Sequence, residues 1–167
     1  MVRYLISLGA DVNQVDNTGQ AALRYAAISW RDASEKIAAL VSAGADVNHR
    51  SNDGSAALSD AAYEQNVAAA RALISHGADI DNRDDQGYTA ISWACGKGTP
   101  KADIVELLLR AGADVHDLYE MGCILQYVDY ENSGGYGRPR ELLLRPQDLR
   151  ERHLYEHSLI PARLTEH

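Results

Sequence analysis

Apolar residues recur at helical spacing in short segments along most of the chain. In Ser55–Glu64 the Ala and Leu positions repeat every three or four residues, which places them on one face of a helix. After a break, Val67–His76 has the same spacing and stops at Gly77, a residue that readily adopts the left-handed conformation of a helix C-terminus. The pattern therefore predicts pairs of short helices joined by turns.

Three sequence markers repeat with one period. The string Gly-Ala-Asp followed by Val or Ile begins at Gly9, Gly44, Gly77 and Gly112, with spacings of 35, 33 and 35 residues. A second glycine precedes the first helix of each pair and has the same spacings, at Gly19, Gly54, Gly87 and Gly122. The segment Glu106–Arg110 recurs as Glu141–Arg145, at an offset of 35. Agreement of three markers on one period indicates a repeat protein.

The segments between the helices predict turns and helix caps. Each Gly-Ala-Asp segment is expected to leave its helix extended and to enter a turn rich in Asn, Asp and Gly, such as Arg50–Gly54. Asp32 and Glu35 have the spacing of a capping box for a second helix. Thr99-Pro100 places an N-cap residue before a proline in the third unit. Both insertions are interpreted as longer turns, with a functional loop as the alternative.

This pattern resembles the ankyrin repeat family. The likeness is carried by the turns Asp16–Gly19, Asn52–Gly54 and Asp84–Gly87 and by the Gly-Ala-Asp segments, and it extends well from Val2 to about His116 and weakly over Asp117–Arg145. It implies an all-α helix-turn-helix solenoid with short β-hairpin-like turn fingers. The expected divisions are a partial repeat 1–15, full repeats 16–50, 51–83 and 84–116, a degenerate capping repeat 117–145 and a helical tail 146–167.

The chain departs from the family at the start of the first helices. The family's Thr-Pro-Leu-His stretch is replaced by Ala21–Arg24, Ala56–Ser59 and Thr89–Ser92, so the threonine remains only once. We expect each loss to weaken local hydrogen bonding by about 1 kcal/mol.

The two ends of the array differ in how they are closed. Terminal repeats need polar caps, yet Val2–Leu8 takes the place of a second helix without a first one before it. We expect this helix to stack on missing repeats of a longer array, on a partner or on a second copy. At the other end, Gln147–Leu159 has helical character and is expected to cap the stack.

Composition and charge exclude several function classes. The 167 residues are 46% apolar and carry a net charge of −8, which argues against nucleic acids and anionic membrane surfaces as partners. No apolar run is long enough to cross a membrane. Two cysteines, Cys95 and Cys123, make no disulfide framework, and no secretory signal is evident. An intracellular, cytoplasmic location is expected.

Candidate chemistry is sparse. His153 and His157 have the i, i+4 spacing of metal ligands but lack a third ligand, and Gly134–Gly137 lacks the Lys and Ser/Thr of a phosphate loop. Cys95 aligns with alanines of the sibling repeats, which predicts a small buried thiol. The repeated Asp46, Asp79 and Asp114 are interpreted as turn residues. We therefore expect no enzyme activity, no cofactor and no metal site.

The resemblance instead implies a concave binding face formed by the turn tips and the exposed side of the first helices. Its positions in this chain are Asn17, Thr18, Gln20, Ile28, Asn52, Asp53, Ser55, Tyr63, Glu64, Asp85, Gln86, Tyr88, Trp93 and Lys97. Aromatic side chains among acids favour a protein partner with basic residues, and Tyr25 and Trp93 alternatively serve as packing. The predicted function is that of an adaptor or inhibitor. The alternatives are a fragment of a longer array that self-associates through Val2–Leu8, and a metal-binding or enzymatic C-terminal segment.

Overall fold

The computed structural model describes residues 1–96 and 102–114, which lie in the first of the chain's two compact units, Met1–Gly135. The described residues form seven helices: α1 (Val2–Ser7), α2 (Ala22–Ala27), α3 (Ala33–Ser42), α4 (Ala57–Tyr63), α5 (Val67–Ser75), α6 (Ala90–Gly96) and α7 (Ala102–Ala111). No sheet occurs among these residues, only isolated antiparallel bridges at Val15–Ala21 and Arg50–Ala56. The predicted all-α fold with hairpin-like fingers is confirmed.

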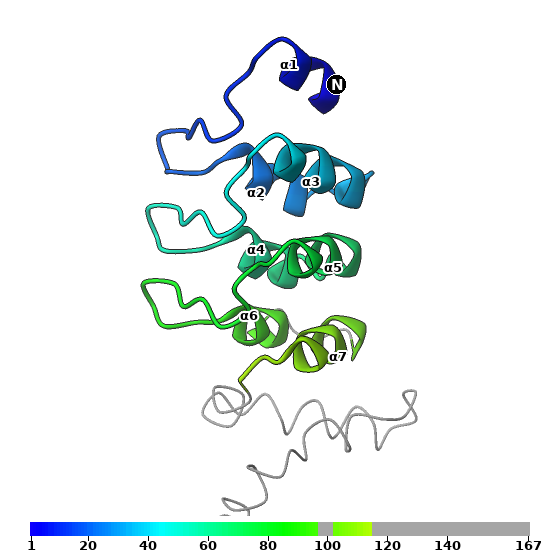
Figure 1. The fold of residues 1–167 in the computed structure, drawn as a ribbon. Coiled ribbons are helices and arrows are strands. Elements are labelled where there is room, and N and C mark those ends of the chain that lie inside the picture. The colour runs from blue at the N-terminus through cyan, green and yellow to red at the C-terminus, as the bar shows by residue number, and fades with distance from the viewer. Residues whose placement is uncertain (97–101, 115–167) are drawn as a thin grey trace, which may run out of the picture. The chain divides into compact units, whose positions relative to one another are not determined.

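The helices pack as three pairs, α2 with α3, α4 with α5 and α6 with α7, stacked in chain order (Figure 1). The first helices contact one another along the series α2, α4 and α6, and the second helices along the series α1, α3, α5 and α7. The loops that precede α2, α4 and α6 project together on one side as fingers (Figure 1). Each finger and the first helix after it therefore repeat at nearly the same place in every unit.

Small side chains let these helices approach closely. Ala27, Ala61, Ala62, Ala69, Ala70 and Ala94 are completely buried. The larger core residues are aliphatic and include Ile37, Leu58, Leu73, Ile91 and Leu108. Cys95 is buried among them, as its alignment with alanines predicts. Repeated burial of the same positions in successive units makes one continuous core.

The starts of the first helices differ between the units that lack the threonine and the unit that keeps it. Ala21 and Ala56 occupy the N-cap positions of α2 and α4, and neither helix has a side-chain cap hydrogen bond. In the third unit the retained Thr89 is buried, with its Oγ1 atom 3.1 Å from the Oγ of Ser92. The hydroxyl pair of the third unit is thus absent from the starts of α2 and α4.

The predicted capping box at Asp32 and Glu35 is wrong. Asp32 does stand at the N-cap of α3, but its φ is 55° and its side chain makes no cap hydrogen bond. An N-cap side chain reaches the first-turn N–H groups from an extended backbone, which the left-handed conformation of Asp32 does not supply. Lys36 holds this turn instead, because its Nζ donates to Ser29 Oγ at 2.6 Å and to the Arg31 carbonyl at 2.7 Å.

Asn66 joins two repeats at a buried position. It caps α5 by accepting a hydrogen bond from Ala69 N at 3.2 Å. Its Nδ2 donates to the carbonyls of Ala27 and Ser29, at 3.0 and 2.9 Å, which lie at the end of α2 in the preceding unit. One amide side chain therefore satisfies backbone groups of two helices.

A second set of bonds between repeats follows the Gly-Ala-Asp segments. Asn13 and Asn48 each donate to the glycine carbonyl of the next segment, at 3.0 and 3.2 Å, and accept from the N–H of its Asp46 or Asp79, at 2.9 and 2.8 Å. At the third junction the residue is Asp81, which accepts from Asp114 N at 2.9 Å. We call these bonds the outer seam.

The aspartates of the second and third of these segments also hold their own turns, as predicted, and the turn after Asp114 lies outside the described residues. Asp46 accepts from Asn48 N at 2.9 Å, and Asp79 accepts from Asp81 N at 3.1 Å. These carboxylates thus take part in the turns of the repeat.

Candidate functional site

The fingers are held in shape by carboxylates at their bases. Asp16 Oδ1 accepts hydrogen bonds from Thr18 N at 2.8 Å, Thr18 Oγ1 at 2.7 Å and Gln20 N at 3.0 Å. These bonds, the Thr18 hydroxyl foremost, hold the pKa of Asp16 well below its usual range. In the third finger Asp84 makes the corresponding hydrogen bonds, because its Oδ1 accepts from the N–H groups of Gln86 and Tyr88, both at 2.9 Å.

The second finger uses a different residue for this purpose. Ser51 replaces the aspartate, and its hydroxyl donates to Asp53 Oδ1 at 2.6 Å. Asp53 also accepts from Ser55 N at 3.2 Å. The Ser51 bond lowers the pKa of Asp53.

An aromatic side chain ties the first and third fingers to their helices. Tyr25 on α2 donates its hydroxyl to Asp16 Oδ2 at 2.7 Å, and Trp93 on α6 donates Nε1–H to Asp84 Oδ2 at 2.8 Å. The bond to Asp16 raises the pKa of Tyr25. Tyr25 is nevertheless 51% exposed, and Trp93 is half-buried. Both side chains therefore support a finger and remain partly accessible to solvent.

Neighbouring fingers are joined through their backbones. Asn52 N donates to the Thr18 carbonyl at 3.1 Å, and Asp85 N donates to the Asp53 carbonyl at 3.0 Å. Gly19, with φ +74°, permits this approach, because an added Cβ atom would lie only 2.9 Å from Asn52 N. The fingers consequently form a connected row and not separate loops.

An ion pair links α2 and α4 behind this row. Arg24 Nε lies 2.7 Å from Asp60 Oδ2, and Arg24 Nη2 donates to Asp60 Oδ1 at 2.8 Å. Burial raises the pKa of Asp60 to about 6, although the guanidinium of Arg24 opposes that shift. Asp53 and Glu64 add a smaller repulsion that acts in the same direction as burial. The sequence pattern did not reveal this ion pair, although Asp60 occupies the same position in its repeat as Tyr25 and Trp93 do in theirs.

Three predicted residues from two repeats meet in one aromatic cluster. The ring centroids of Tyr63 on α4 and Trp93 on α6 are 5.6 Å apart with an interplanar angle of 88°. Tyr88, in the third finger, lies 5.2 Å from Trp93 at 69°. Both are edge-to-face contacts of the kind that aromatic pairs prefer. Tyr63 remains 39% exposed, so the cluster lies open to solvent.

The other predicted positions differ in their exposure to solvent. Exposed residues at the finger tips are Asn17, Thr18, Asn52, Asp53, Asp85 and Gln86, while Gln20, Ser55 and Glu64 are half-buried. Ile28 follows the end of α2 and is 38% exposed. Lys97 lies outside the described residues. Trp30, in the turn before α3, was not predicted and is 64% exposed.

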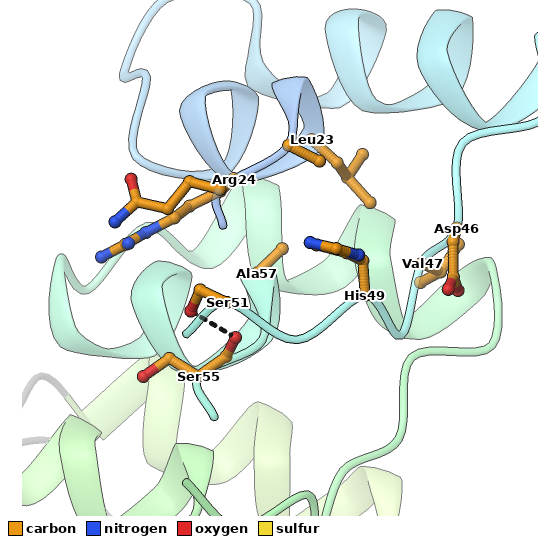
Figure 2. Close-up of a pocket in the computed structure, with 10 residues that line it drawn as sticks. Leu23, Arg24, Asp46, Val47, His49, Ser51, Ser55 and Ala57 are labelled. Carbon is orange, nitrogen blue, oxygen red and sulfur yellow. Dashed lines mark hydrogen bonds between the residues drawn. The ribbon is translucent and has the colours of Figure 1, made fainter. Parts of the chain in front are cut away.

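A small hollow lies between α2 and the second finger (Figure 2). The hollow is lined by Leu23 and Arg24 of α2 and by His49, Ser51 and Ser55 of the second finger (Figure 2). Its volume is about 10 Å³, which accommodates about one water molecule. His49 approaches the Gly19 carbonyl at 2.7 Å on this side. The hollow is a joint between repeats and is too small for an organic ligand.

The comparison with protein families agrees with this architecture. A model of ankyrin repeats, in three copies, matches residues 30–118. The chain belongs to the ankyrin repeat family. Ankyrin repeats are generally protein–protein interaction modules, and the fold is a non-enzymatic one. No curated protein matches the chain.

Other chemistry has little support in the described part of this ankyrin array. No group of three His, Cys, Asp or Glu side chains there is placed to hold a metal ion. None of the described helices is long and apolar enough to span a membrane. The His153 and His157 pair, the Gly134–Gly137 loop and the Thr99-Pro100 cap lie outside the described residues, as do the expected repeat 117–145 and tail 146–167.

Proposed function

We propose that this ankyrin array recognises a protein partner through the face formed by its fingers and by α2, α4 and α6, as an adaptor or inhibitor without bond chemistry. The observation that carries the proposal is the solvent-exposed cluster of Tyr63, Tyr88 and Trp93, which spans two repeats on a hydrogen-bonded frame. Aromatic anchors of this kind dominate the binding energy of protein interfaces. A preformed frame also limits the entropy lost on binding.

The charge of this face favours a basic partner. The fingers and first helices, residues 14–29, 49–66 and 82–96, contain six acidic residues and three arginines. Arg24 is engaged with Asp60, and Arg50 and Arg83 donate to backbone carbonyls of the third finger, at 2.8 and 3.0 Å. An acidic face steers a basic partner during encounter and disfavours acidic ones.

A pull-down with matched variants tests the proposal. Tyr63→Ala with Tyr88→Ala removes two aromatic side chains from the face, and Glu35→Ala with Arg71→Ala changes two exposed residues of the outer helices α3 and α5. Circular dichroism first establishes that both variants are folded. A protein captured by the native chain and the outer variant, but lost by the tyrosine variant, is the expected result. Equal capture by all three would move the interface elsewhere, and no capture would contradict the proposal.

A second candidate function is self-association through α1. None of its residues is buried, and Tyr4 and Leu5, together with Leu8 directly after the helix, are 65%, 47% and 66% exposed. Apolar side chains gathered in this way are typical of contact surfaces. Sedimentation of the native chain and of a Leu5→Lys, Leu8→Lys variant tests it. A concentration-dependent dimer abolished by the two lysines supports self-association, and a monomer at high concentration contradicts it.

A further inference from the structure

We infer that the cluster of Tyr63, Tyr88 and Trp93 receives an arginine side chain of the partner. The inference rests on the function proposed above and specifies the chemical group that this site binds. Three features carry it: the crossed ring planes, the carboxylates around the rings and the engagement of the nearby arginines.

The ring geometry suits a cation. The planes of Tyr63 and Tyr88 stand at 88° and 69° to the indole plane of Trp93, so the rings do not stack into one flat layer. Crossed planes allow one cation to contact more than one negative π-face, which a flat stack does not. The exposure of Tyr63, at 39%, leaves the cluster accessible from solvent.

Nearby carboxylates strengthen this preference. Trp93 donates Nε1–H to Asp84 Oδ2 at 2.8 Å, and this hydrogen bond to an anion increases the electron density of the indole ring. On α4, Asp60 lies three residues before Tyr63, on the same side of the helix, and Glu64 follows directly. Asp60 and Glu64 are close enough to influence each other electrostatically. Arg24 balances the charge of Asp60, so the acidic residues that remain next to the rings are Asp84 and Glu64.

An arginine fits these surroundings better than other side chains. Its guanidinium is planar and weakly hydrated, so it can stack on an aromatic ring while it donates hydrogen bonds to a carboxylate. An ammonium group is more strongly hydrated, and an apolar side chain would remove water from the carboxylates without replacing their hydrogen bonds. Arg50 lies close to the third finger, with Nη2 3.8 Å from Asp85 Oδ1, and it donates a hydrogen bond to the Arg83 carbonyl.

The test is an NMR titration of the full chain with short peptides at low salt. The probe is acetyl-Gly-Gly-Arg-Gly-Gly-amide, and the comparison peptides carry citrulline or lysine in place of arginine. Citrulline has nearly the same shape without the charge. The readout is the indole N–H resonance of Trp93, assigned with a Trp30→Phe variant. Tyr63→Leu removes a ring but keeps an apolar side chain, and the outer variant Glu35→Ala with Arg71→Ala is the control away from this face.

The expected result is a saturable shift of the Trp93 indole by the arginine peptide, with a dissociation constant in the millimolar range. We expect binding at least about 10-fold weaker for citrulline and about 5-fold weaker in Tyr63→Leu, with little change in the outer variant. Equal affinity for arginine and citrulline, tighter binding of lysine, or an unaffected Trp93 would overturn the inference. A partner that depends on Tyr63 and Tyr88 in the pull-down, without arginine binding, would remove this inference alone.

Discussion

The outer seam supports one stabilising and one destabilising prediction, because its third junction has Asp81 where the other two junctions have an asparagine. Asn48 donates to the Gly77 carbonyl at 3.2 Å and also accepts from the next segment. Asp81 keeps the acceptor bond, with Asp114 N at 2.9 Å, but a carboxylate has no amide hydrogen for the Gly112 carbonyl. Asp81→Asn should therefore stabilise the array, and Asn48→Asp should destabilise it.

The magnitude follows from one hydrogen bond and one charge. A net intramolecular hydrogen bond contributes about 0.5–1.5 kcal/mol, and the exposure of both residues favours the lower half of that range. Asp81→Asn also removes a negative charge near the C-terminal end of α7, which adds about 0.3–1 kcal/mol. We expect a change of about 1 kcal/mol for each variant, with opposite signs. The corresponding shift in Tm is about 3–5 °C.

Equilibrium urea unfolding followed by circular dichroism measures these changes. The double variant, Asn48→Asp with Asp81→Asn, should return close to the native stability, because the two sites lie at different junctions. A loss of stability in Asp81→Asn, or shifts of the same sign in both single variants, would refute this account of the seam.

Three further changes test other parts of the structure. The pKa of Asp60 is raised to about 6, so its protonated form stabilises the native state at low pH and this stabilisation is lost as the pH rises through that value. Between pH 4 and pH 7 the native chain should therefore lose up to about 3 kcal/mol of unfolding free energy relative to Asp60→Asn. A difference in urea midpoints that does not vary with pH would disprove this. Ala56→Thr should gain about 1 kcal/mol beside the buried Ser59, whereas Ala56→Val should not, as thermal unfolding will show. Gly77 has a φ of +86°, which valine resists and asparagine tolerates better. Gly77→Val should therefore lower the free energy of unfolding by more than about 1 kcal/mol, and Gly77→Asn should lower it less. Identical urea midpoints for the two variants would contradict this explanation.

The fold was predictable because its signals recur. The spacing of Gly9, Gly44, Gly77 and Gly112 sets the repeat, and each of these residues has positive φ. The helices expected at Ser55–Glu64 and Val67–His76 occur at Ala57–Tyr63 and Val67–Ser75. A period observed in several units averages out local exceptions, which a single segment cannot do.

The features that were missed are those that occur once. Asp32 has the residue type and spacing of a cap, but its backbone conformation depends on the turn that Lys36 holds. Asp60 stands where the first and third repeats have an aromatic residue, and its partner Arg24 lies 36 positions away in the sequence. Pattern alone therefore did not reveal this ion pair. Trp30 lies in an insertion without a counterpart in the second repeat. Such contacts depend on the folded geometry more than on periodicity.

The face itself was predicted only as a set of positions. Repeat register indicates that Tyr63, Tyr88 and Trp93 belong to it, but their mutual contacts arise because adjacent repeats stack. The role of Tyr25 could not be assigned from sequence either, since one ring both binds Asp16 and stays half exposed. Side-chain direction decides these points, and it follows from packing.

The hydrogen bonds that join neighbouring fingers do not depend on the side chains that the fingers expose. The backbone N–H groups of Asn52 and Asp85 donate to carbonyls of the preceding finger. Every residue except proline has this donor. Tip side chains such as Asn17 and Gln86 can therefore be exchanged without loss of those bonds, whereas Gly19 and Gly54 cannot change without a clash. Selection can thus alter the chemistry of this surface while the spacing between its fingers stays constant, and a designer can randomise the tips and keep the two glycines.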